Sequence, residues 1–138
     1  MNTLECKKIL IITFLIIILS PLVNAKSNRS LEYSECMNHT DGIAMNSQYA
    51  SCAEDEFLRQ EKILNTAYTK LMKGSNKEQQ IWLIKGQNAW MSYRENWCRV
   101  EEQSSFAPGG FANYHYCLLE KTEKQIDVIQ NFSFETFN

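Results

Sequence analysis

The chain has 138 residues, of which 44% are hydrophobic and 22% charged, with 14 basic and 16 acidic side chains. This length and composition are typical of one globular domain and exclude a disordered or low-complexity chain. The net charge of −2 disfavours nucleic-acid binding, which requires a basic surface. Only 5 glycines and 2 prolines are present, too few for a turn-rich sandwich or barrel.

The N-terminal segment has the pattern of a secretory signal peptide. Two lysines precede an apolar run over residues 9–19, and Ala25 is a small residue suited to cleavage. The run is shorter than the roughly 20 residues that a membrane-spanning helix requires, so a retained anchor is the weaker alternative. We expect removal of residues 1–25, which leaves a domain over residues 26–138 with no stable membrane insertion.

Four cysteines remain in the predicted mature chain, and their even number predicts two disulfides formed outside the cytosol. They are Cys36, Cys52, Cys98 and Cys117, and none stands in the CxxC spacing of zinc or thiol-redox sites. Four cysteines allow three pairings. We favour Cys36–Cys52 with Cys98–Cys117, and a Cys52–Cys98 bond is the main alternative.

The first helix is predicted over about residues 48–73. The preceding residues 26–47 are polar, and we expect an irregular surface lead-in there, held by Cys36. Within 48–73, apolar residues recur at three- and four-residue steps, as on a helix with one buried face. The predicted buried face comprises Ala53, Phe57, Leu58, Leu64, Ala67, Tyr68 and Leu71.

A short connection sets the direction of the second helix. Gly74 can adopt the left-handed conformation that ends a helix, and residues 75–78, Ser-Asn-Lys-Glu, have the form of a capping box. The second helix is therefore predicted over about residues 77–102. So short a loop makes the two helices antiparallel.

A loop and a third helix complete the predicted fold. One face of the second helix carries Leu83, Gln87, Trp90, Arg94 and Cys98, flanked by Tyr93 and Trp97. Residues 103–111 contain a proline and two glycines, which predicts a loop. The third helix, over about residues 112–130, faces inward with Cys117, Leu118, Thr122, Gln125, Ile126 and Ile129. The expected fold is an all-α three-helix bundle, an antiparallel helical hairpin plus a third helix, stapled by two disulfides.

Several of these features resemble one family of exported bacterial domains. The motifs are Cys52, Leu64-Asn65-x-x-Tyr68-x-x-Leu71, Gln87-x-x-Trp90-x-x-Tyr93-Arg94-x-x-x-Cys98, Gly109-Gly110 and Cys117-x-x-x-x-Thr122. In this order, over about residues 36–130, they resemble the N-terminal domain of the lysozyme inhibitor LprI family. The resemblance implies a helical, disulfide-bonded envelope or secreted protein, and the family name implies inhibition of lysozyme.

Polar residues on the predicted inner faces have two interpretations. The set is Asn65, Gln87, Trp90 and Arg94. It forms either a ligand site or a buried polar seam, and we favour the seam because buried amides and guanidinium groups need hydrogen-bond partners. In a hairpin that turns near residue 75, Glu61 lies opposite the 87–90 stretch, and Glu54 and Glu56 lie near Arg94.

The remaining chemistry-bearing residues give weaker predictions. The three tryptophans could form a sugar-binding platform, but we expect Trp90 and Trp97 in the core and only Trp82 exposed. His39 and His115 are the only histidines, and no catalytic, metal-binding or phosphate-binding motif accompanies them. We expect no catalytic residues, no metal and no cofactor, with a small hydrolase as the least favoured alternative.

One pole of the predicted bundle collects acidic and aromatic side chains. The acidic residues are Glu54, Asp55, Glu56, Glu95, Glu101 and Glu102. A solvated acidic end is the simpler interpretation, and a docking surface for a basic partner is the functional one. Its candidate contact residues are Glu101, Glu102, Phe106, Gly109, Gly110 and Phe111.

Together these features favour a non-enzymatic periplasmic or secreted protein that blocks a basic cell-wall hydrolase by protein–protein contact. The expected partner is lysozyme or another basic envelope or host protein, with no nucleic acid. The alternative is an envelope structural or interaction module, for example one associated with virulence, without lysozyme binding.

Overall fold

The computed structural model describes residues 29–40 and 45–134, which form four helices and no strand. They are α2 (Leu31–Asn38), α3 (Met45–Lys73), α4 (Lys77–Glu102) and α5 (Gly109–Asn131). The three-helix prediction is therefore corrected, because the lead-in contains α2. Ser30 caps this helix by accepting a hydrogen bond from the Tyr33 N–H. The predicted signal peptide lies outside the described residues.

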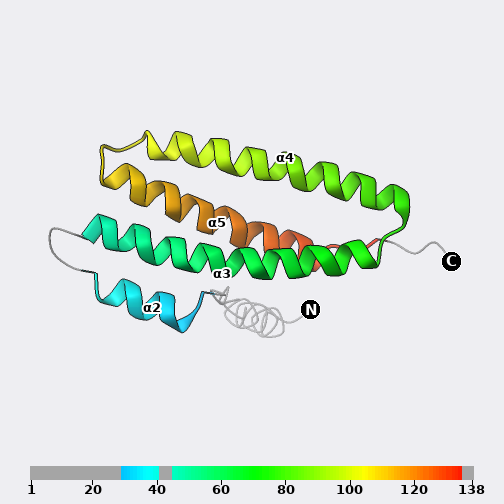
Figure 1. Cartoon of the computed structure of the whole chain (residues 1–138), viewed down its shortest axis with the longest axis horizontal. Helices are drawn as coiled ribbons and strands as arrows, with labels where there is room; N and C mark the ends of the chain where they lie inside the picture. The colour runs from blue at the N-terminus through cyan, green and yellow to red at the C-terminus, as the bar shows by residue number, and fades with distance from the viewer. Residues whose placement is uncertain (1–28, 41–44, 135–138) are drawn as a thin grey trace, which may run out of the picture.

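Helix α5 lies between α3 and α4 and packs against both (Figure 1). Helices α3 and α4 run antiparallel, as predicted, but they make few direct contacts with each other. The short helix α2 lies against α3. The hairpin is therefore splayed, and α5 provides the surface on which its two arms pack.

Two disulfides join the helices near one end of the bundle, and both favoured pairings are confirmed. Cys36–Cys52 links α2 to α3 with a Cα–Cα distance of 5.8 Å, and Cys98–Cys117 links α4 to α5 with a Cα–Cα distance of 5.5 Å. Such crosslinks stabilise a small domain mainly by restricting its unfolded chain. The alternative Cys52–Cys98 bond is excluded.

The start of α4 confirms a capping box but places it one residue later than predicted. Asn76 is the N-cap, and its side chain accepts from the Gln79 N–H while the Gln79 side chain accepts from the Asn76 N–H, each at 2.9 Å. Ser75 instead donates its hydroxyl to the Leu71 carbonyl. Gly74 does not adopt the predicted left-handed conformation. An ordinary tight turn therefore connects α3 to α4.

The core is divided into three small clusters along α5. Tyr33, Cys52, Ala53 and Leu119 join α2, α3 and α5, whereas Cys98, Tyr114, Cys117 and Leu118 join α4 to α5. Leu64, Ile126 and Ile129 form the third cluster, toward the far end of α3 and α5. Most residues predicted to face inward from the third helix are buried.

Residues predicted on or beside the inner faces are instead exposed. Leu58 on α3 is 51% exposed, and Tyr93 and Trp97 on α4 are 50% and 45% exposed. On α4 only Arg94 and Cys98 are buried. The reason is that α4 packs chiefly against one helix, so a single narrow face is covered and the flanking positions remain in water.

Among the described residues, no helix is both long and apolar enough to cross a bilayer.

Candidate functional site

The loop between α4 and α5 is fixed at the end of the bundle that carries the disulfides (Figure 1). It spans residues 103–108 and is shorter than predicted, because Gly109 and Gly110 form the first turn of α5. The Cys98–Cys117 bond joins the two helices just below the loop. The connection is therefore held from beneath by a covalent crosslink.

Gly110 allows the backbone of the loop to pass directly over the start of α5. A Cβ atom at this position would lie 2.3 Å from the Glu102 carbonyl oxygen and 2.7 Å from that of Ser105. At Gly109, by contrast, a Cβ would make ordinary contact, 3.5 Å from the Ser105 side chain. The paired glycines thus have different roles, and Gly110 is the one required for close approach.

Hydrogen bonds hold the loop in one conformation. The Phe106 carbonyl accepts from the N–H groups of Gly109 (2.9 Å) and Gly110 (3.2 Å). The Asn113 side-chain amide donates to the hydroxyls of Ser104 and Ser105, each at 3.1 Å. A loop whose backbone and side chains are both bonded loses little conformational entropy when it binds a partner.

Two aromatic side chains project from this fixed loop and the turn that follows it. Phe106 is 98% exposed, and Phe111 is 49% exposed. Phe111 rests edge-on against the buried His115 ring, with ring centroids 4.4 Å apart. Phe106 makes almost no contact with the rest of the chain, although burying a phenylalanine is normally favourable by about 1.5–3 kcal/mol. We refer to Glu101, Glu102, Phe106, Gly109, Gly110 and Phe111 as the loop surface.

The charges around the loop surface are more balanced than the sequence predicted. Arg99 donates to Glu102 at 2.9 Å and to Glu95 at 3.3 Å, so one cation is shared by two carboxylates. Glu101 accepts from the indole N–H of Trp97 at 2.6 Å. Glu101 is thus held by a neutral donor and forms no ion pair within the described residues.

Glu56 is a clear departure from the predicted acidic surface. It is 2% exposed, and its carboxylate accepts hydrogen bonds from Arg59, from the Ser30 N–H and hydroxyl, and from Gln60. Burial alone would raise the pKa of Glu56, but these hydrogen bonds outweigh it and lower the pKa from 4.5 to about 2. Glu56 therefore attaches the lead-in to α3, whereas Glu54 and Asp55 remain exposed on that helix.

The predicted polar seam exists around Arg94, with different partners. Its guanidinium donates to Glu61 at 2.7 Å and to Thr122 at 2.9 Å, and it lies over the rings of Phe57 (5.0 Å) and Trp90 (4.8 Å). Neither Glu54 nor Glu56 reaches it, because the splayed arms of the hairpin bring Glu61 to its level instead. Arg94 thus links α3, α4 and α5.

The other predicted members of the seam are less involved. The Gln125 amide donates to Gln87 at 3.5 Å, a weak hydrogen bond between α5 and α4. Asn65 is exposed on α3 and lies outside the seam, which corrects that prediction. Arg94 is buried between the helices, whereas Glu61, Gln87 and Trp90 are only partly buried.

Trp82 is exposed on α4 as predicted, but the sequence analysis missed that Tyr93 and Trp97 are exposed as well. Trp82, Tyr93 and Trp97 are 64%, 50% and 45% exposed, and the Lys121 ammonium lies 5.6 and 5.7 Å from the ring centroids of Tyr93 and Trp97. The signal was present, because residues 82, 86, 89, 93, 97 and 100 recur at steps of three and four on one side of the helix. Trp97 also extends the loop surface through its bond to Glu101.

The two histidines lie in different surroundings. His115 is buried between Phe111 and Tyr114, and His39 is the C-cap of α2. Within residues 29–40 and 45–134, no three His, Cys, Asp or Glu side chains gather closely enough to hold a metal ion.

The segment that matches a known family includes the bonded cysteines of all four helices and the loop surface. Residues 36–128 match the family described as Lysozyme inhibitor LprI. The matched segment contains all four bonded cysteines and both loop glycines. The chain has no significant match among curated proteins or among solved structures. Because the match spans most of the 138 residues, the chain belongs to the lysozyme inhibitor LprI family.

Proposed function

We propose that the chain is an exported, non-enzymatic inhibitor that blocks a basic lysozyme by covering its substrate cleft with the loop surface. Membership of a lysozyme inhibitor family supports the class of partner. The two disulfides support a destination outside the reducing cytosol, in the periplasm or beyond the cell. The loop surface supplies the contact.

The observation that carries this proposal is the exposure of Phe106 on a rigid support. A side chain that is 98% exposed gives the free protein no packing energy. Its position is nonetheless fixed by the Phe106 carbonyl bonds, by Gly110 and by the Cys98–Cys117 crosslink. Aromatic anchors that enter a pocket of the partner are typical hot spots of protein interfaces.

Charge supports the choice of a basic partner. Glu101 is bonded to the neutral Trp97 indole rather than to a cation, and Glu54 and Asp55 are exposed on α3. The chain as a whole carries a net charge of −2. Attraction between this surface and a basic enzyme raises the association rate at low ionic strength and weakens as salt is added.

The test is inhibition of lysozyme acting on cell walls by the mature, oxidised chain. Phe106→Ala should weaken inhibition by about 10- to 100-fold, the loss typical of a buried aromatic anchor. Trp82→Ala is the matched control, because it removes an exposed aromatic (64%) near the start of α4, at the other end of that helix from the loop surface. Equal inhibition by the Phe106→Ala variant and the parent would exclude the loop surface as the contact.

The salt dependence tests the electrostatic part separately. The inhibition constant should increase between low and physiological ionic strength, mainly through a slower association rate. If inhibition does not change with salt, the chain still acts as an inhibitor, but Glu101 and the α3 carboxylates do not contribute to the attraction.

The exposed aromatic face of α4 favours a second candidate function. Trp82, Tyr93 and Trp97 present apolar area that the bundle does not cover, as expected of an envelope interaction module with a non-lysozyme partner. Complete absence of inhibition by correctly oxidised protein, across lysozymes of different classes, would favour this function over the first.

A further inference from the structure

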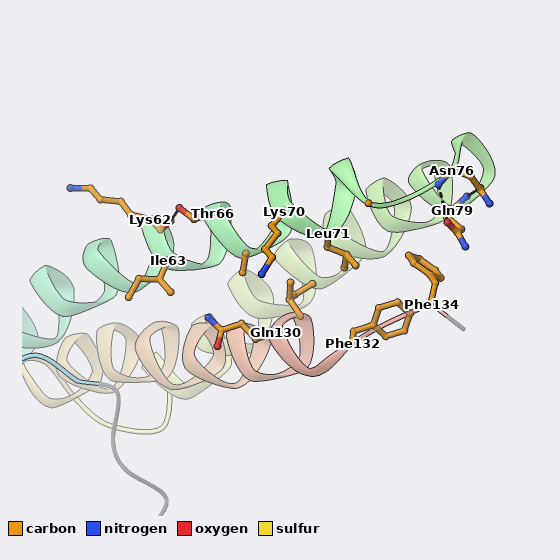
Figure 2. Close-up of a pocket in the computed structure, with 13 residues that line it drawn as sticks. Lys62, Ile63, Thr66, Lys70, Leu71, Asn76, Gln79, Gln130, Phe132 and Phe134 are labelled. Atoms are coloured by element: carbon orange, nitrogen blue, oxygen red, sulfur yellow. Dashed lines mark hydrogen bonds between the residues drawn. The ribbon is translucent and has the colours of Figure 1, made fainter. Parts of the chain in front are cut away.

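An apolar groove lies at the end of the bundle opposite the loop surface. Figure 2 shows its larger part, a hollow of about 1120 Å³ bounded by the last turns of α3, the end of α5 and the segment that carries Phe132 and Phe134. A second hollow of about 440 Å³ continues toward α4. Gln79, Ile129 and the two phenylalanines line both hollows, which therefore adjoin each other, and the smaller one also includes Glu78. We refer to the larger hollow as the groove.

The walls of the groove are suited to a hydrocarbon chain. In the larger hollow they include Ile63, Ala67, Leu71 and Ile129, with Phe132 and Phe134 at one end (Figure 2). The two phenylalanine rings meet edge to face at 4.9 Å, and Phe132 is still 47% exposed. Ligand pockets in proteins commonly measure about 300–1,000 Å³, so this groove has room for a ligand of that size.

Several polar groups at the rim of the larger hollow are bonded within the chain, and the charged groups of its lining are lysines. Asn76 and Gln79 satisfy each other in the capping box, and the Thr66 hydroxyl donates to the Lys62 carbonyl. Lys62 and Lys70 are the two charged residues in the described lining of the larger hollow, which contains no carboxylate. Neither lysine forms an ion pair within the described part of the chain.

The positive charge of Lys70 lies at the mouth of the groove. Figure 2 shows the Lys70 ammonium extending across the groove toward α5, where the amide of Gln130 also faces the opening. A carboxylate between these two groups could accept hydrogen bonds from both. A positive site of this kind contrasts with the net negative charge of the whole chain.

We propose that this groove binds a long-chain fatty acid, with its carboxylate at Lys70 and Gln130 and its hydrocarbon chain along Leu71, Ile129 and the two phenylalanines. Charge complementarity selects an anionic over a cationic amphiphile. The apolar walls select a long chain over a short one. This proposal is independent of lysozyme inhibition, which uses the opposite end of the molecule.

The experiment is calorimetric titration of the mature, oxidised chain with dodecanoate below its micellar concentration. One dodecanoate should bind per chain, and affinity should rise about fourfold for each methylene added between octanoate and dodecanoate. Dodecyltrimethylammonium, which has the same chain and the opposite charge, should bind at least tenfold more weakly.

Two variants with the same change of charge separate the groove from general electrostatics. Lys70→Glu should weaken dodecanoate binding by about tenfold or more, whereas Lys124→Glu, at an exposed position on α5 outside the groove, should leave it unchanged. Ala67→Phe should also weaken binding by filling the groove, provided that its circular dichroism spectrum matches the parent. Absence of dodecanoate binding, equal affinity for both head groups, or equal effects of the two lysine variants would overturn the proposal.

Discussion

Replacement of Glu56 by glutamine tests the link between the lead-in and α3. The carboxylate accepts from the Ser30 N–H and hydroxyl, from Arg59 and from Gln60, and its pKa lies near 2 rather than 4.5. A difference of about 2.5 pH units between the folded and unfolded chains corresponds to about 3 kcal/mol of folding free energy. Glu56→Gln should therefore unfold about 3 kcal/mol more easily at pH 7.

The pH dependence has a definite sign. Because the pKa of Glu56 is lowered on folding, its contribution is complete above pH 4.5 and is lost as the pH falls toward 2. Urea unfolding followed by circular dichroism should show the difference between the parent and Glu56→Gln shrinking toward zero over this range. Glu54→Gln, an exposed change on the same helix, is the control and should have little effect. A stability difference that stays constant from pH 7 to pH 2.5 would refute this reasoning.

Further predictions concern the glycines and the seam. Gly110→Ala should lower the unfolding free energy by about 1–3 kcal/mol, because the new methyl group meets two backbone carbonyls, whereas Gly109→Ala should change thermal stability little. Arg94→Ala should lower the melting temperature by several degrees, because it leaves the partly buried Glu61 carboxylate unpaired. If the melting temperature is unchanged and inhibition is lost, Arg94 is instead a contact residue. Gly86→Ala should raise the free energy of chemical unfolding by up to about 1 kcal/mol, because a methyl group at this exposed helix position meets no other atom. A lower unfolding free energy would contradict this reasoning.

The helix boundaries were predictable where local signals agree with tertiary packing. The bounds of α4 follow from its N-terminal cap and from the proline-containing loop after it. The predicted topology favoured the observed cysteine pairs but left Cys52–Cys98 open, because it placed Cys52, Cys98 and Cys117 at the same end. Helix α2 was missed because its sequence is polar around a single buried Tyr33. One anchoring aromatic and a disulfide stabilise it, and neither produces a periodic pattern.

The candidate site was only partly predictable, because it depends on which helices touch. Periodicity placed Trp97 beside the inner face of α4, but it could not show that α5 alone would cover that helix. The same splayed packing explains why Arg94 meets Glu61 and why Glu56 turns to Arg59 and Ser30. By contrast, the exposure of Phe106 followed from the loop composition, since no helix face continues through residues 103–108.

Helix α4 is attached to its neighbouring helices at both of its ends. The Cys98–Cys117 crosslink fixes one end to α5, and the tight connection at residues 74–76 fixes the other to α3. Between these points α4 packs chiefly against α5, and Arg94 links it to Glu61 on α3 and Thr122 on α5, so its other central turns are held by few contacts. Amide exchange in those turns then reports a local excursion of α4 rather than unfolding of the whole molecule.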